Sequence, residues 1–210
     1  MSKTVLLVDD AAIVRMMQKK LLEENGYVVV GEATCGAEAV EKHRSLKPDL
    51  CILDITMPGM DGLVVLKYLK SSNKDAKVVM CSSSWYLKDV VSALLNGALN
   101  FVTKPFQRDR FIYTIENALN SKHGFNDALL NSLADECNVY EDVRMSQDQI
   151  SELLTYVSAQ NAGVFDINEI FEKLGILYQE TKTDETTLEK LIKNQEKIIH
   201  MLELILHKFD

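Results

Sequence analysis

The first 120 residues repeat one pattern five times: a short apolar run is followed by a longer stretch with helical periodicity. The apolar runs are continuous rather than alternating, which is typical of strands buried on both faces of a sheet. Five such strands alternating with five helices predict an α/β fold with a five-stranded, doubly wound parallel sheet. The runs are Val5–Val8, Tyr27–Val30, Leu50–Leu53, Val78–Cys81 and Asn100–Val102, and the helical stretches are Ala11–Glu24, Ala37–Leu46, Gly62–Leu69, Leu87–Leu95 and Arg108–Asn120.

Polar residues follow four of these predicted strands, at the point where each strand ends. Because ligands of such sheets bind beyond the carboxyl ends of the strands, these side chains are expected to converge on one site. They are Asp9 and Asp10 after the first strand, Asp54 after the third, Ser82 after the fourth and Lys104 after the fifth.

The predicted group of side chains has a definite chemistry. Three carboxylates around one point repel one another unless a cation joins them, and hard carboxylate oxygens suit Mg²⁺. A lysine supplies a mobile positive charge for a phosphoryl oxygen, and a serine hydroxyl can donate to another. The set indicates metal-assisted phosphoryl transfer with a carboxylate as nucleophile, and Asp54 is the central candidate.

The sequence around these positions resembles the receiver domain of bacterial two-component response regulators. The resemblance covers about the first 120 residues and implies a flavodoxin-like fold. It rests on an ordered set of motifs, each at a predicted strand end: Val5-Leu6-Leu7-Val8-Asp9-Asp10, Leu53-Asp54-Ile55-Thr56-Met57-Pro58-Gly59-Met60-Asp61-Gly62, Ser82-Ser83, and Thr103-Lys104-Pro105-Phe106.

The resemblance implies roles for individual residues. Asp54 would accept a phosphoryl group from a phosphohistidine on a sensor histidine kinase or a phosphotransfer protein. Mg²⁺ would be held by Asp9, Asp10, Asp54 and the backbone carbonyl of Thr56. Lys104 would pair with the phosphoryl group, and its bond to Pro105 would be cis. The chain would then be a phosphorylation-dependent switch rather than an enzyme acting on other substrates.

Two further positions concern the switch itself. By resemblance, Ser82 is the hydroxyl that moves towards the phosphoryl group, and Phe101 is the aromatic residue that swings inward with it. These movements would change the surface formed by the fourth helix, fifth strand and fifth helix. Simple core packing is the alternative role for Phe101. Trp85 is expected to lie over the site, on the switching face, or on the surface as a plain exposed aromatic.

The last 90 residues have a different character. The first 120 residues hold 15 basic and 14 acidic side chains, whereas the remainder hold 8 basic and 17 acidic ones. Such asymmetry suggests two modules, which we predict to be a receiver domain at 1–121 and an acidic, all-helical output domain at 122–210. The expected helices are Asn126–Cys137, Gln147–Gln160, Ile167–Leu174 and Thr187–Lys208, and Ser146 with Gln149 forms a capping-box pattern.

The sequence of this tail is compatible with more than one class of function. Its last predicted helix carries an apolar stripe that can pack on other tail helices or pair with a second chain as a coiled coil, giving a homodimer. An interaction module is therefore the main hypothesis. The alternative is a DNA-binding transcriptional regulator with a degenerate helix-turn-helix at Ile167–Ile176, which the acidic charge opposes. A weaker alternative is an enzymatic tail using residues such as Glu152, Gln160 and Asn161.

The location is predicted to be cytoplasmic, with no membrane contact. No apolar run approaches the roughly 18 residues that span a bilayer. The four cysteines, Cys35, Cys51, Cys81 and Cys137, show no metal-like spacing. Free thiols in a reducing compartment are the expected state.

Overall fold

The protein is represented by a computed structural model, which describes residues 2–83, 85–121, 125, 127–136, 143–158 and 167–175. The chain divides into two compact units, Met1–Ile170 and Phe171–Asp210. The first unit contains the sheet and every residue of the predicted phosphoryl-transfer site. None of the helices in the described ranges is long and apolar enough to cross a bilayer.

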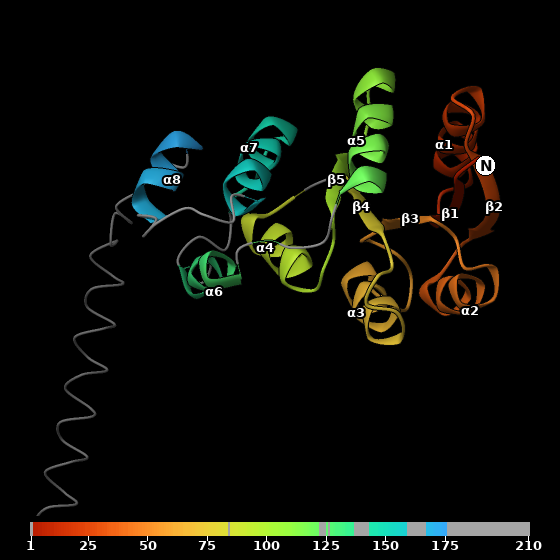
Figure 1. Ribbon diagram of the computed structural model, residues 1–210, viewed down its shortest axis with the longest axis horizontal. Coiled ribbons are helices and arrows are strands. Elements are labelled where there is room, and N and C mark those ends of the chain that lie inside the picture. Colours follow the sequence, from red (N-terminus) through yellow and green to blue (C-terminus); the bar gives the residue numbers. More distant parts are fainter. Residues whose placement is uncertain are drawn as a thin grey trace, which may run out of the picture. The chain divides into compact units, whose positions relative to one another are not determined.

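The first unit is built on a parallel sheet of five strands, shown in Figure 1. Each strand pairs in parallel with its neighbours, in the order β2-β1-β3-β4-β5. The predicted five-stranded parallel sheet is confirmed, and β5 lies at one edge of it. The strands are β1 (Thr4–Val8), β2 (Val28–Ala33), β3 (Leu50–Asp54), β4 (Val78–Ser82) and β5 (Asn100–Thr103).

Five helices cover the two faces of the sheet. Helices α1 and α5 lie on one face and α2, α3 and α4 on the other, as expected for a doubly wound sheet (Figure 1). Their bounds differ from the sequence-based ones by at most a few residues. They are α1 (Ala12–Glu24), α2 (Gly36–Leu46), α3 (Gly62–Ser72), α4 (Leu87–Leu95) and α5 (Arg108–Asn120).

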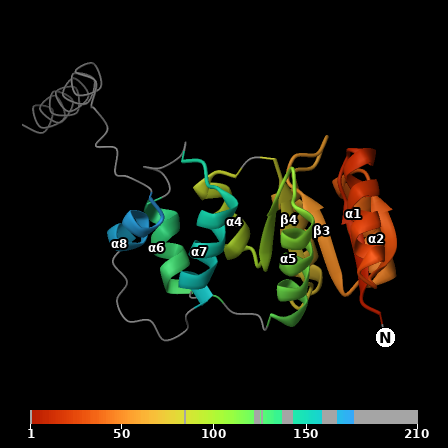
Figure 2. The same cartoon turned by 90° about the horizontal axis from the view of Figure 1, so that it is seen from above.

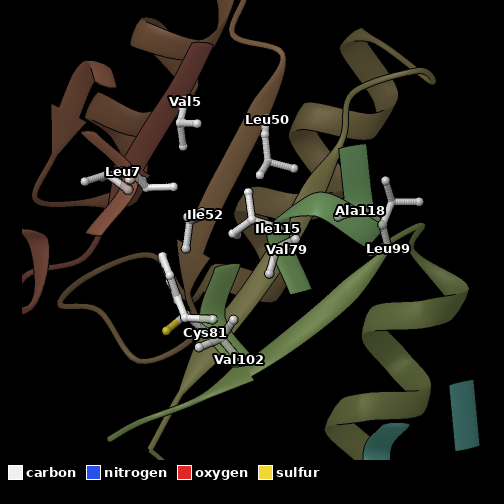
Figure 3. Packing of buried hydrophobic residues seen from close by; sticks show 12 residues of the cluster. Val5, Leu7, Leu50, Ile52, Val79, Cys81, Leu99, Val102, Ile115 and Ala118 are labelled. Atoms are coloured by element: carbon white, nitrogen blue, oxygen red, sulfur yellow. The ribbon is translucent and has the colours of Figure 1, made fainter. Parts of the chain in front are cut away.

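The core explains why the strand sequences are continuous apolar runs. Alternate strand residues face α1 and α5 and form one buried cluster with residues of those helices (Figure 3). In β1, β3 and β4 the residues between them face the opposite layer and are buried as well, so both faces of these strands are apolar. The cluster consists of Val5, Leu7, Leu22, Leu50, Ile52, Val79, Cys81, Leu99, Val102, Phe111, Ile115 and Ala118.

The described part of the tail consists of helices joined with one isolated β-bridge and short irregular segments. It contains α6 (Asp127–Glu136), α7 (Gln147–Ser158) and α8 (Ile167–Lys173). The predicted capping box is present: the Ser146 amide donates to Oε1 of Gln149 (2.8 Å), and the Gln149 amide donates to Oγ of Ser146 (3.2 Å). The predicted helix Thr187–Lys208 lies outside the described residues, so an all-helical output domain stays a prediction.

Helices α6 and α7 pack against the receiver part of the chain. Helix α6 contacts α4 and helix α7 contacts β5, at the end of the sheet opposite α1 and α2 (Figure 2). The compact unit therefore continues past the predicted module boundary at 121/122 and ends at Ile170. Apolar side chains such as Leu133, Ile150 and Leu153 explain this continuity, because each is fully buried.

Candidate functional site

The predicted polar residues meet at the carboxyl end of the sheet. Strands β1, β3, β4 and β5 are neighbours in that order, so the residues that end or follow them come together. The side chain of Lys104 is the link between them. Its Nζ atom lies 2.6 Å from Oδ2 of Asp9 and 2.9 Å from Oδ2 of Asp54.

Backbone contacts hold both carboxylates in place. The Asp9 amide donates to the Ala33 carbonyl (3.1 Å) on β2, and the Ala11 amide donates to Oδ1 of Asp9 (2.9 Å). Behind Asp54, a Cβ atom on Gly62 would lie 2.0 Å from the Asp54 carbonyl oxygen. Only glycine permits so close an approach of α3 to the end of β3, so Gly62 belongs to the support of the site.

Burial and ion pairing shift the pKa values of Asp54 and Lys104. Asp54 is only 4% exposed, and burial raises the pKa of its carboxyl, an effect that the hydrogen bond and charge of Lys104 only partly offset. Burial alone would lower the pKa of Lys104, but its bonds to Asp9 and Asp54 outweigh that effect and raise it. Lys104 is therefore held in its charged form between two carboxylates.

The acidic residues form a group that fits a divalent cation. Oxygen atoms of Asp9, Asp10 and Asp54 lie within 4.8 Å of one another, and Asp10 is exposed to solvent. Three carboxylates with an open, hydrated side are the kind of site in which Mg²⁺ keeps several waters. The Thr56 amide donates to Oδ1 of Asp54 (3.4 Å), so the loop that carries Thr56 folds beside the same carboxylate.

The two expected switch residues lie on the neighbouring strands β4 and β5. Ser82 ends β4 and is buried, and its backbone carbonyl accepts a hydrogen bond from the Lys104 amide (2.7 Å). Phe101 on β5 is fully buried. The peptide bond between Lys104 and Pro105 is cis.

Trp85 is not a surface aromatic, so that alternative was wrong. Its side chain is 1% exposed and packs edge-on against the Phe101 ring, with ring centroids 4.9 Å apart. Its Nε1 atom is buried without a hydrogen-bond partner in the described part of the chain. Trp85 therefore connects the loop after β4 to the edge strand β5.

One residue at the edge of this region carried no recognisable sequence signal. The side-chain amide of Gln147, in the first turn of α7, bonds to Phe101 and Thr103 of β5. Glutamine is common near helix starts, so nothing in the local sequence pointed to a contact 44 residues away along the chain.

Comparison with known proteins points to one family. The family model of the response regulator receiver domain matches residues 5–116. Chemotaxis protein CheY of Bacillus subtilis is 47% identical over 120 residues, which are 57% of this chain and 100% of that protein. Chemotaxis protein CheY of Thermotoga maritima is 46% identical over 112 residues, which are 53% of this chain and 93% of that protein.

Solved structures show the same fold. The response regulator domain of Thermotoga maritima CheB has a TM-score of 0.53 and 34% identity, over 58% of this chain and 99% of that one. A chain of the CheX-CheY-BeF3-Mg complex from Borrelia burgdorferi has a TM-score of 0.55 and 30% identity, over 57% of this chain and 90% of that one. Through residues 5–116, the chain belongs to the response regulator receiver domain family of two-component signalling proteins.

Proposed function

We propose that Asp54 accepts a phosphoryl group from a phosphohistidine on a sensor histidine kinase or a phosphotransfer protein. The observation that carries this proposal is the buried Asp54 carboxylate, with Oδ2 2.9 Å from Nζ of Lys104, at the carboxyl end of the sheet. A carboxylate oxygen is the nucleophile, and the Lys104 ammonium neutralises charge on the incoming phosphoryl oxygens.

Receiver domains bind Mg²⁺ at their acidic pocket, and the corresponding pocket here holds three carboxylates. We propose that Asp9, Asp10, Asp54 and the Thr56 carbonyl bind the ion. Bound there, Mg²⁺ would offset the repulsion between the carboxylates and a phosphate. Because Lys104 contacts two of these carboxylates, the lysine and the ion would compete for them.

Receiver domains act as phosphorylation-dependent switches, and Ser82 and Phe101 are the proposed moving parts. Phosphorylation adds nearly two negative charges, which attract hydrogen-bond donors. A shift of the Ser82 hydroxyl towards the phosphoryl group moves the loop after β4, and Phe101 follows. The affected surface is that of α4, β5 and α5, where α6 and α7 also pack.

We propose that the tail is an interaction module, in keeping with its acidic charge. Pairing of two chains through the predicted helix 187–208 remains part of this proposal, although that helix lies outside the described residues. The predicted helix-turn-helix begins with α8, which ends at Lys173, and the position of a recognition helix also lies outside them. A cytoplasmic location is part of the proposal, because Cys35, Cys51 and Cys81 are free thiols.

Labelling with acetyl phosphate tests the phosphorylation site. The full chain is incubated with acetyl phosphate and Mg²⁺, and intact mass spectrometry counts the phosphoryl groups gained. The wild-type chain and an Asp109→Asn control, which alters an exposed carboxylate in α5, should each gain one group that EDTA prevents. Asp54→Asn should gain none. Equal labelling of Asp54→Asn and the wild type would refute the assignment.

A further inference from the structure

The edge of the receiver sheet is closed by a side chain of the tail. Strand β5 is an edge strand, so one row of its backbone groups has no neighbouring strand among the residues that the structure describes. Oε1 of Gln147 accepts from the Thr103 amide (2.8 Å) and from the Thr103 hydroxyl (2.7 Å). Its Nε2 atom donates to the Phe101 carbonyl (2.9 Å). The carboxamide thus takes the place of a peptide group in a sixth strand.

The residues just before Gln147 pair with the loop after β4. The Met145 amide donates to the Trp85 carbonyl (2.9 Å), and the Leu87 amide donates to the Val143 carbonyl (2.9 Å). Between these bonds, Tyr86 and Arg144 form an antiparallel bridge. This is a short two-stranded ladder between the tail and the loop that follows the proposed switch residue Ser82.

Side chains strengthen the ladder. The Arg144 guanidinium lies 5.4 Å from the centre of the Tyr86 ring and donates to the Tyr86 hydroxyl (3.1 Å). The Met145 residue of the ladder is buried, with 6% of its surface exposed. An ion pair between Arg110 and Asp148 (2.6 Å) adds little, because the Asp148 side chain is 87% exposed.

We infer that Val143–Gln147 is a built-in ligand of the receiver's switch region and that phosphorylation of Asp54 releases it. This rests on the proposed function. The segment binds the neighbours of the site: Thr103 directly precedes Lys104, and Trp85 lies three residues after Ser82. Lys104, which bridges Asp9 and Asp54, is therefore one residue from the docked edge of β5.

The direction follows from the geometry of the ladder. Movement of Ser82 towards a phosphoryl group displaces the loop at Trp85–Leu87, whose backbone bonds to Val143 and Met145 require a fixed register. Because coupling between two sites is reciprocal, a segment that phosphorylation weakens must itself oppose phosphorylation. While docked, it also keeps the β5 edge from pairing with an extended segment of another chain.

Backbone hydrogen exchange in the full chain tests the docking. The Thr103, Leu87 and Met145 amides are all donors in these contacts, so each should exchange slowly. Gln147→Ala should speed Thr103 exchange by about tenfold, because the Thr103 amide loses its side-chain acceptor, a partly buried hydrogen bond. Glu152→Ala, which truncates an exposed side chain further along α7, should leave Thr103 exchange unchanged. Equal Thr103 exchange in Gln147→Ala and the wild type would overturn the docking.

Addition of Mg²⁺ and beryllofluoride tests the release. Exchange at Leu87 and Met145 should become faster, and Gln147→Ala should require less beryllofluoride than the wild type for half-maximal change. Unchanged or slower exchange at both amides would overturn the inference. Acetyl phosphate labelling of Asp54 is measured in parallel. If Asp54 is labelled but the segment is not released, only the release inference is refuted. If Asp54 is not labelled, the proposed function is refuted, and the Gln147→Ala comparison still tests the docking.

Discussion

The indole of Trp85 meets the ring of Phe101 edge-on, with the planes at 88° and the centroids 4.9 Å apart. This geometry places the positive edge of one ring against the negative face of the other, which is the preferred aromatic contact. The pair connects the loop after β4 to β5, which is also the strand that Gln147 binds. It is thus a packing link between the proposed phosphorylation site and the tail.

Removal of the indole should destabilise the protein strongly. Trp85 is 1% exposed, so Trp85→Ala leaves a large cavity and should cost about 3–5 kcal/mol in the free energy of unfolding. Urea denaturation followed by circular dichroism measures this. Tyr68→Ala is the control, because Tyr68 is 53% exposed and should change stability by less than about 1 kcal/mol. Similar losses in both variants would contradict the packing role of Trp85.

The sheet and the site could be predicted because their signals are local and repeat. Each strand is an apolar run, and in a parallel sheet the residue after each run lies at the same edge. Asp9, Asp54 and Lys104 could therefore be grouped without knowing any distance. The contact of Lys104 with both carboxylates was not itself predicted, because it depends on how far the lysine side chain reaches across the strand ends.

The contacts of the tail could not be predicted, because they depend on packing between distant parts of the chain. Gln147 binds β5 only because Val143–Met145 pairs with the loop after β4 and brings the start of α7 to the sheet edge. Trp85 follows a strand in a polar stretch, which is also where exposed aromatic residues occur. Its burial involves edge-on packing against Phe101, which lies on another strand.

Gly62 should tolerate no side chain. An added Cβ would meet the Asp54 carbonyl oxygen at 2.0 Å and the Ile55 Cα at 2.8 Å, and both are backbone atoms that cannot rotate away. Gly62→Ala should therefore cost at least about 3 kcal/mol in unfolding free energy and reduce labelling of Asp54. Urea denaturation and the acetyl phosphate assay measure the two effects.

Gly59→Ala separates crowding from backbone strain. Gly59 has a φ of 83° and nothing within 4 Å of an added Cβ, so alanine there should cost only the left-handed penalty of about 1–2 kcal/mol. If Gly62→Ala proves no more harmful than Gly59→Ala, then the approach of α3 to β3 is not as tight as the geometry indicates.

Removal of the Lys104 amine should tighten Mg²⁺ binding. Its Nζ atom lies 2.6 Å from Oδ2 of Asp9 and 2.9 Å from Oδ2 of Asp54, so the ion must compete with a positive charge for these oxygens. For Lys104→Ala we expect about tenfold tighter binding by isothermal titration calorimetry, because one nearby unit charge is lost. Labelling of Asp54 should fall in the same variant, since the phosphoryl oxygens lose their cationic partner.

Lys74→Ala is the matched control for that titration. It removes the same charge from an exposed position in the loop after α3, where screening by salt leaves little effect on the site. Weaker or unchanged Mg²⁺ binding by Lys104→Ala would mean that the lysine and the ion do not compete.

Asp54→Asn should raise the melting temperature at about pH 7, and the gain should shrink as the pH falls towards the ordinary aspartate range near pH 4. Burial raises the pKa of Asp54 in the folded chain, so folding disfavours its charged form. The resulting destabilisation is absent below the unfolded pKa and complete above the folded pKa, and asparagine removes it.

Asp49→Asn should behave oppositely, because the Thr4 amide lowers the pKa of Asp49. Its carboxylate stabilises the fold at neutral pH, and that contribution is lost as the pH falls through the folded pKa. Thermal unfolding of both variants between about pH 4 and pH 7 checks whether their melting temperatures change in opposite directions. A lower melting temperature for Asp54→Asn at neutral pH would show that pairing with Lys104 affects the stability of the Asp54 carboxylate more than burial does.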